Sequence, residues 1–256
     1  MEKRVQVHIP YPVLDRRFKD VLKAGINPEV FVDGRSLDRM RSARVKEIGE
    51  GLRERGLSVT LHGPFMELSP GSPDEKIRLI TMERYRQTFE VVSLLRPATV
   101  VLHAGYDDRS FDWDVDLWLD RSLRTWPEFV REAERLGTVI ALENVFEEDP
   151  GPIKRLVQSL DSPNLGVCLD AGHLNLFSRV GLEEWFCELG AKIEEVHLHD
   201  NNGLRDDHLP VGEGSIDFQM FFALLDRYSN DPVYTIEPHG EGALEKGLEA
   251  VRRFLQ

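Results

Sequence analysis

Short runs of apolar and β-branched residues alternate with longer amphipathic runs along the whole chain. The short runs predict strands at residues 5–9, 29–33, 57–62, 98–103, 138–143, 165–170, 193–199 and 232–237. The longer runs, with apolar residues every three or four positions, predict helices at residues 10–24, 36–55, 74–95, 115–136, 152–160, 182–189, 218–228 and 243–254. Regular alternation of strand and helix is typical of a parallel sheet built from βα units.

Several helix boundaries are marked by residues that favour or interrupt helical backbone. Pro10 and Pro12 predict the start of the first helix, and Gly25 predicts its end. Ser36 is the predicted N-cap of the second helix.

The strand–helix units predict an α/β fold, a (β/α)₈ TIM barrel formed by a single domain over residues 1–256. Closure into a barrel removes the exposed edges of the sheet, and no linker-like stretch divides the chain. An open doubly wound sheet is the alternative, but no G-x-G-x-x-G motif follows the first strand. We therefore expect the closed barrel.

Groups that can bind a metal or move a proton stand at the end of every predicted strand. They are His8, Asp33, His62, His103, Glu143, Asp170, His197 with His199, and Glu237. The carboxyl ends of barrel strands meet at one face, where barrel enzymes build their active sites. Because burying so many titratable groups without partners is costly, a shared divalent cation is the expected solution.

These residues differ in how strongly the sequence supports a chemical role. Glu143 and Glu237 lie in otherwise apolar strands, where a glutamate is rarely buried unless paired. Asp170 and His173 are three residues apart, a spacing that lets one ion contact both. Alternatively, His62 and His103 are structural histidines of the core whose ring nitrogens are hydrogen-bonded. His8 and Asp33 have the weakest support, since either also suits a polar turn beside a strand.

The stretch over residues 193–214 carries the densest chemistry of the chain. His197 and His199 alternate with apolar residues and therefore share a strand face. Asp206 and His208 follow in a polar loop that continues to Gly214. Imidazole and carboxylate together form a ligand set for a divalent transition metal. The alternative is a solvated turn, since turns are rich in Asp, Asn and Gly.

Composition narrows the class of protein. The formal net charge is −13, which weighs against nucleic acid as the principal ligand because contacts to phosphate dominate such binding. No run approaches the about 18 apolar residues of a membrane-spanning helix, and the first residues lack the apolar core of a secretory signal. Cys168 and Cys187 form no disulfide framework, so we expect a cytoplasmic protein. Cys168, in an apolar strand, is expected to be a packed core thiol.

The motifs HGPF, LHAG, LEN, CLDAGH, VHLHDN, DDHLPVGEG and IEPH occur in this order from the third strand to the last. Together they resemble the xylose isomerase-like TIM barrel superfamily, which contains the sugar phosphate isomerases and epimerases, the inosose isomerases and dehydratases, and endonuclease IV of AP endonuclease family 2. The resemblance covers nearly the whole chain and implies the barrel fold.

The resemblance also implies a metal centre. In endonuclease IV-like members three zinc ions are held by residues that match His62, His103, Glu143, Asp170, His173, His197, Asp206, His208 and Glu237. In epimerase-like members one Mn, Mg or Co ion is held by residues that match Glu143, Asp170, His197 and Glu237. His197 rather than His199 matches the ligand, because Asp200 stands three positions after it.

The leading hypothesis is a metal-dependent isomerase or epimerase of a small sugar, sugar phosphate or related hydroxy-ketone, which transfers a proton through an enediolate. Glu143 and Glu237 are the predicted catalytic residues, while His8, His173, His199 and Arg205 are predicted to contact substrate. The cofactor is a divalent Zn, Mn, Mg or Co ion, one per chain for an isomerase. The expected partner is a carbohydrate, without nucleic acid or membrane, and the sequence is compatible with an oligomer.

Two alternatives remain at this point. An endonuclease IV-like zinc-dependent phosphodiesterase, an AP endonuclease, would use up to three zinc ions. The nine-residue match supports it, but the exit loops carry no basic cluster, and Arg35, Arg205 and Lys154 are their only obvious cations. A non-catalytic barrel with a vestigial site would lack some of the ligand residues, and none is missing.

Overall fold

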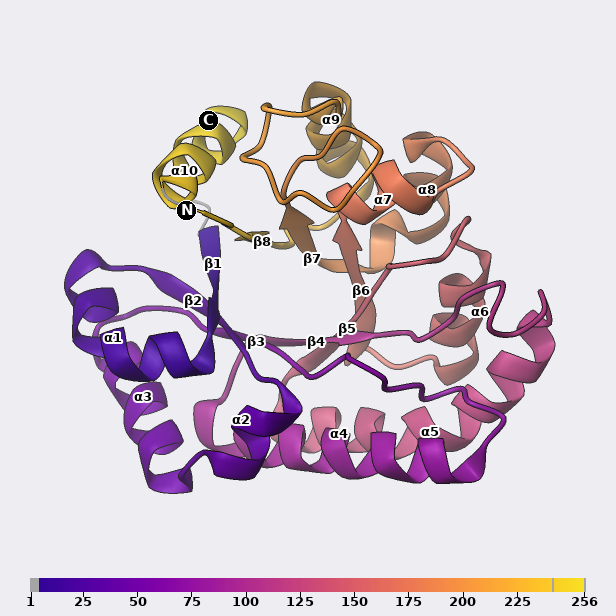
Figure 1. The fold of residues 1–256 in the computed structure, drawn as a ribbon, viewed down its shortest axis with the longest axis horizontal. Helices are drawn as coiled ribbons and strands as arrows, with labels where there is room; N and C mark the ends of the chain where they lie inside the picture. The colour runs from indigo at the N-terminus through magenta and orange to yellow at the C-terminus, as the bar shows by residue number, and fades with distance from the viewer. Residues whose placement is uncertain (1–4, 241, 256) are drawn as a thin grey trace.

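The computed structural model describes residues 5–240 and 242–255 and shows a closed parallel barrel in which each strand pairs with its neighbours in chain order, β1 to β8 (Figure 1). The strands are β1 (Val5–Pro10), β2 (Asn27–Phe31), β3 (Thr60–His62), β4 (Thr99–His103), β5 (Val139–Glu143), β6 (Leu165–Asp170), β7 (Ile193–Leu198) and β8 (Val233–Ile236). Pairing of β1 with β8 closes the barrel, as the sequence predicted.

Helices surround the barrel on its outside (Figure 1). They are α1 (Tyr11–Ala24), α2 (Gly34–Arg39), α3 (Ser42–Glu54), α4 (Glu75–Leu95), α5 (Val115–Leu136), α6 (Gly151–Leu160), α7 (Ala171–Phe177), α8 (Leu182–Leu189), α9 (Phe218–Tyr228) and α10 (Ala243–Phe254), with a short 3₁₀ helix η1 (Gly190–Lys192) before β7. Among the described residues, no helix combines the length and the apolarity that crossing a bilayer requires.

The predicted helix over 36–55 is wrong in one respect, because two helices occupy this region. The backbone at Met40 and Arg41 is extended, with ψ of 146° and 123°, so the helical hydrogen-bond series stops between α2 and α3. The N-cap is also different from the prediction. The carboxylate of Asp33 accepts a hydrogen bond from the backbone N–H of Ser36 at 2.7 Å, which places Ser36 inside α2. Asp33 therefore caps a helix.

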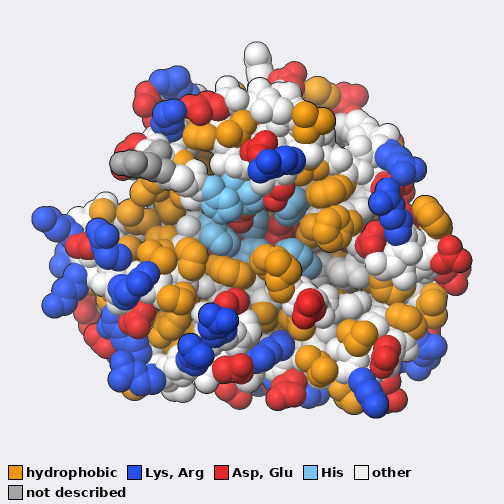
Figure 2. Space-filling model, viewed as in Figure 1, with side chains coloured by type: hydrophobic (Ala, Val, Ile, Leu, Met, Phe, Trp, Pro, Cys, Tyr) orange, Lys and Arg blue, Asp and Glu red, His pale blue; other side chains and the backbone are white. Residues whose placement is uncertain are grey.

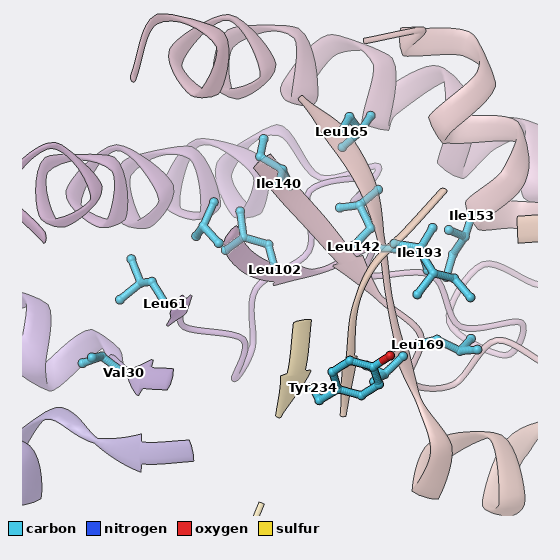
Figure 3. Close-up of a cluster of buried hydrophobic side chains, with 14 of the residues drawn as sticks. Val30, Leu61, Leu102, Ile140, Leu142, Ile153, Leu165, Leu169, Ile193 and Tyr234 are labelled. Carbon is cyan, nitrogen blue, oxygen red and sulfur yellow. The ribbon is translucent and has the colours of Figure 1, made fainter. Parts of the chain in front are cut away.

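The main core lies between the barrel and its helices. Because successive strand residues point to opposite sides, Leu102, Leu142 and Leu169 face outward while their neighbours in the chain face the barrel axis. Figure 3 shows these leucines among the buried side chains of this shell. The outward set packs the helices, which leaves the inward set free to carry chemistry.

A small second cluster fills the barrel interior. Val101, Ala141 and Cys168 are fully buried there and form an apolar layer, so Cys168 is a packed core thiol as predicted. Glu195 is also fully buried, and its carboxyl oxygens accept hydrogen bonds from the hydroxyls of Thr99 and Thr235. Burial, followed by the negative charge of Glu29, raises the pKa of Glu195 to about 8.

Candidate active site

The inward-facing strand residues meet at the mouth of the barrel formed by the strand ends. Register places His103 of β4 opposite Glu143 of β5, and Asp170 of β6 opposite His197 of β7. In parallel strands such pairs stand at the same depth, so residues far apart in the chain come into contact.

All of the chain's histidines gather at this mouth. They are linked ring to ring or through shared carboxylates, and they comprise His8, His62, His103, His173, His197, His199, His208 and His239. Figure 2 shows them at the centre of one face, with acidic side chains among them and hydrophobic side chains around them. Imidazoles and carboxylates at this density form a ligand set for metal ions.

Glu143 is the centre of the imidazole cluster. Its Oε2 lies 3.0 Å from Nε2 of His62 and 3.2 Å from Nε2 of His103, and its Oε1 lies 3.2 Å from Nδ1 of His173. Burial by itself would raise the pKa of Glu143, but the charges of His103 and His197 hold it well below its usual range. The carboxylate is thus strongly stabilised in its charged form, which attracts cations.

A second feature points to one metal position. Nδ1 of His197 is buried and has no hydrogen-bond partner among the described residues. It lies 3.3 Å from Oε1 of Glu237, 3.6 Å from Oε1 of Glu143 and 3.8 Å from Oδ2 of Asp170. Ligands at about 2.1 Å from a tetrahedral ion stand about 3.4 Å apart. The separation of Nδ1 of His197 from each of the three carboxylates is therefore close to that between two ligands of one divalent ion.

Glu29 orients this histidine and was not predicted. Its fully buried carboxylate contacts Nε2 of His197 at 3.1 Å and Nδ1 of His8 at 2.7 Å. A proton on Nε2 leaves the lone pair of Nδ1 directed at the three carboxylates. The sequence prediction selected Asp33 on this strand because it placed the strand two residues too late. An acidic residue inside an apolar strand was the signal that could have found Glu29.

Further pairs of imidazole and carboxylate that could bind a metal lie beside the group formed by His197, Glu143, Asp170 and Glu237. Oδ2 of Asp170 lies 3.0 Å from Nε2 of His199, and Oδ2 of Asp206 lies 3.0 Å from Nε2 of His208. Oε2 of Glu237 lies 3.2 Å from Nδ1 of His208. The sets His62–Glu143–His197, Asp170–His173–His199 and His199–His208–Glu237 each bring their ligand atoms within 4.8 Å of one another.

Asp200 organises the loop that carries Asp206 and His208. Its buried carboxylate accepts hydrogen bonds from the backbone N–H groups of Asn201, Gly212, Gly214 and Ile216 at 2.8 to 3.2 Å. Gly214 approaches so closely that a Cβ there would stand 2.3 Å from Oδ1 of Asp200. The acidic residue three positions after His197 thus acts as the anchor of this loop.

Replacing Asp200 with asparagine should destabilise the protein by about 2–3 kcal/mol, because the amide has one acceptor oxygen for four N–H groups and each unpaired group is costly. We expect the melting temperature to fall by about 5 to 10 °C, measured by differential scanning calorimetry. Asp207 is the matched control, since it lies in the same loop and its carboxylate pairs with the exposed Arg205. Equal melting temperatures for the two variants would contradict the anchoring role.

A cavity of about 850 Å³ opens above the ionic cluster. Its lining includes His8, His62, His103, Glu143, His173, Asp206, His208, Glu237 and His239 together with several aromatic side chains, but no lysine or arginine among the described residues. Arg205, a predicted substrate contact, is instead 83% exposed and pairs with Asp207. Lys154 pairs with Glu188 outside the cavity.

Two histidines occupy places that the sequence prediction did not foresee. His199 was expected to touch substrate, but it is 1% exposed and lies behind His208, whose ring stacks on it at 3.9 Å. A Cβ on Gly172 would stand 2.0 Å from the His199 ring, so glycine is required for this close approach. His239 stacks on the other side of His208 at 4.0 Å and lines the cavity. His239 follows Glu237 by two residues, and this closeness in the chain was the sequence feature that could have indicated a place in the site.

Glu147 is a further acidic group that the sequence analysis missed. It lines the cavity, is 3% exposed and accepts a hydrogen bond from the backbone N–H of Val145 at 2.7 Å. Burial raises the pKa of this carboxyl from 4.5 to about 7, so it holds a proton in weakly acidic solution.

Replacing Glu147 with glutamine should change how stability depends on pH. Because the folded-state pKa is raised, its contribution is fully present below about pH 4.5 and is lost as pH rises through about 7. The glutamine variant should therefore match the parent near pH 5 and be more stable by about 2–3 kcal/mol near pH 8. Urea unfolding at both pH values checks this, and a constant difference between the two proteins would contradict it.

Comparison with known proteins agrees with this geometry. Residues 24–256 match the family model described as xylose isomerase-like TIM barrel. The uncharacterized protein MJ1311 of Methanocaldococcus jannaschii is 34% identical over 213 residues, which cover 80% of this chain and 73% of that protein.

Solved structures show the same barrel. A D-tagatose 3-epimerase-like protein is 28% identical, with a TM-score of 0.84 over 98% of this chain and 97% of the other. The IolI protein with a bound zinc atom superposes with a TM-score of 0.79 at 17% identity over 98% of both chains, a likeness of fold. The family match, the relative and the closed barrel confirm the resemblance seen in the motifs, and the chain belongs to the xylose isomerase-like TIM barrel family.

Proposed function

We propose that this protein is a divalent-metal-dependent isomerase or epimerase of a small sugar or related hydroxy-ketone. The observation that carries the proposal is the position of Nδ1 of His197, within 3.8 Å of oxygens from Glu143, Asp170 and Glu237. Glu143 is the last residue of strand β5, and Glu237 directly follows strand β8. This arrangement supports one ion site with two candidate proton carriers beside it at the floor of the cavity.

The proposed chemistry is transfer of a proton next to a carbonyl. Glu143, Asp170, His197 and Glu237 would hold a divalent ion, which would supply polarisation of a carbonyl and so make the adjacent C–H bond more acidic. Glu143 or Glu237 takes this proton, and the same or the other carboxylate returns it to the enediolate. His173, whose Nδ1 lies 3.2 Å from Oε1 of Glu143, and His8, whose Nδ1 lies 3.3 Å from Oε1 of Glu237, would hold the two carboxylates in place.

Family membership and the relatives support the same chemistry. The D-tagatose 3-epimerase-like protein has the highest identity of the two superposed structures, and the IolI protein carries zinc. The cavity lining adds its own support, since imidazoles and carboxylates form its floor.

The test is hydrogen exchange with solvent. The protein is loaded with Mn²⁺, Co²⁺ or Zn²⁺ and incubated in D₂O with each 2-ketohexose, and NMR follows deuterium incorporation next to the carbonyl. We expect exchange with at least one sugar and one metal, and none after chelation. Absence of exchange under every combination would contradict an epimerase of free ketohexoses.

A second candidate function is zinc-dependent hydrolysis of phosphodiesters. It is favoured by the additional ligand-competent sets around His62, His199 and His208, and opposed by the lack of lysine and arginine among the described cavity residues. Elemental analysis separates the two, since an isomerase should hold about one ion per chain and a trinuclear hydrolase about three. A metal-anomalous diffraction map would place those ions.

A further inference from the structure

The cavity has two chemically different parts. Its floor is ionic, as described above, but its walls are mostly apolar, with several aromatic side chains among a few polar and acidic ones. Phe31 lines it from the end of β2, Phe65 and Met66 from the loop after β3, Phe146 from the loop after β5 and Phe177 from α7. In Figure 2 hydrophobic side chains border the central histidines. A ligand that fits this cavity needs a polar end and an apolar end.

The aromatic walls start directly at the ligand-competent histidines. The ring of Phe65 stacks on His103 with centroids 4.6 Å apart and planes 11° apart. The ring of Phe177 lies 6.3 Å from that of His173 and 5.1 Å from that of Phe146. A molecule whose reacting carbons lie at the floor would therefore extend straight onto aromatic surface.

Two of the apolar wall residues are exposed at the edge of the cavity. Met66 is 76% exposed and Phe146 is 51% exposed, although both line the cavity. Leaving large apolar side chains in water at the entrance of a cavity is unfavourable, and such surface commonly marks a place that a ligand covers. An apolar substituent of the ligand could therefore bury the exposed apolar surface of these two side chains.

Charge and size favour the same kind of ligand. Above the floor, the charged side chains that line the cavity, such as Glu67 and Asp107, are acidic. The described lining has no lysine or arginine that could pair with a phosphate. The volume of about 850 Å³ is near the upper end of the range for cavities that bind drug-sized molecules. A single sugar at the floor would leave the aromatic part of this volume unfilled.

From these observations we infer that the substrate is an uncharged sugar-type hydroxy-ketone that carries an aromatic or similarly sized apolar substituent, away from the carbon that exchanges its proton. The sugar end lies at the ionic floor, and the substituent lies against Phe65, Met66, Phe146 and Phe177. This inference rests on the proposed function for the orientation of the sugar. The preference for the substituent is a property of the cavity walls and can be measured separately.

The experiment compares matched ligands on the metal-loaded protein. Each 2-ketohexose is tested as the free sugar, as its 6-O-benzyl ether and as its 6-phosphate, with binding measured by titration calorimetry and proton transfer by deuterium exchange at C3. For at least one ketohexose we expect the benzyl ether to bind tenfold or more tightly than the free sugar, because its ring buries apolar surface. The phosphate should bind no more tightly than the free sugar.

The two readouts separate the two proposals. Exchange with free sugars but no binding advantage for any benzyl ether, or tenfold tighter binding of a phosphate, would overturn the substituent and leave the epimerase intact. Preferential binding of the benzyl ether without exchange would support the apolar subsite and count against proton transfer. Absence of both binding preference and exchange would overturn both.

Variants at the edge of the cavity locate the subsite. Replacing Met66 and Phe146 together with serine should reduce the ratio of benzyl-ether affinity to free-sugar affinity by at least threefold, since both side chains would contact the ring. Leu204→Ser is the matched control, because Leu204 is 86% exposed, lies in the loop after β7 and does not line the cavity. An equal loss in the control would show that the preference is not made at these walls.

Discussion

Replacing Glu143 with glutamine should lower kcat for deuterium exchange by at least about a thousandfold, since general base catalysis alone contributes about 10² to 10⁴. Glutamine has the same shape and fills the same buried site, but its amide neither accepts a proton nor offers a charged ligand. The three imidazoles around it, His62, His103 and His173, would also lose a negative partner. Steady-state exchange rates and metal content measure the two effects separately.

Glu148→Gln is the control for this substitution. Glu148 lies in the loop that follows the same strand, but its carboxylate pairs with Arg179 at 2.6 Å and does not line the cavity. The control should keep the exchange rate and the metal content of the parent. A Glu143 variant that binds a full complement of metal and retains a tenth of the parental rate would rule out Glu143 as the proton carrier.

The second large effect is expected at Glu29, which does not itself line the cavity. Replacing it with alanine removes the acceptor of the His197 Nε2 proton and the nearest carboxylate partner of His8. Loss of such an orienting carboxylate typically weakens metal binding about 10- to 100-fold. Removing one partner of a buried ion pair is also destabilising, by about 3–5 kcal/mol.

Glu29→Gln distinguishes orientation from packing. The amide oxygen of glutamine can still accept from Nε2 of His197, so most of the metal affinity should return. Competition with a chelator gives the affinity, and the absorption spectrum of the Co²⁺ form reports the geometry of its ligands. Asp33→Asn is the control, because Asp33 caps α2 by accepting from the N–H of Ser36. Equal losses of affinity at Glu29 and Asp33 would contradict the orienting role.

Much of the site could be predicted from the sequence because strand periodicity and fold closure act together. Once the chain was recognised as a (β/α)₈ barrel, the last inward residue of each strand had to face one mouth, so Glu143, Asp170 and His197 could be placed near one another. Glu29 escaped because the predicted β2 was displaced by two residues. A displacement of two keeps the inward-facing phase of the strand but selects a residue at a different depth.

Other parts depended on contacts between distant segments. Arg205 and His199 were both near the predicted site in the chain, but the anchored loop directs Arg205 to solvent and His208 covers His199. The residues around Glu147 resemble those of any polar loop, and it is burial in the folded protein that raises the pKa of its carboxyl. The helix over 36–55 divides at Met40 and Arg41, where no glycine or proline marks the break.

The sequence by itself determined the barrel, the order of its elements and the chemical types gathered at its mouth, because these follow from local periodicity and from the rule that parallel strand ends share one face. Only the tertiary structure decided which nitrogen of His197 faces the carboxylates, which histidines reach the cavity, and that the walls are aromatic and free of described lysine or arginine. Those features depend on side-chain direction and depth, which arise when residues far apart in the chain pack together.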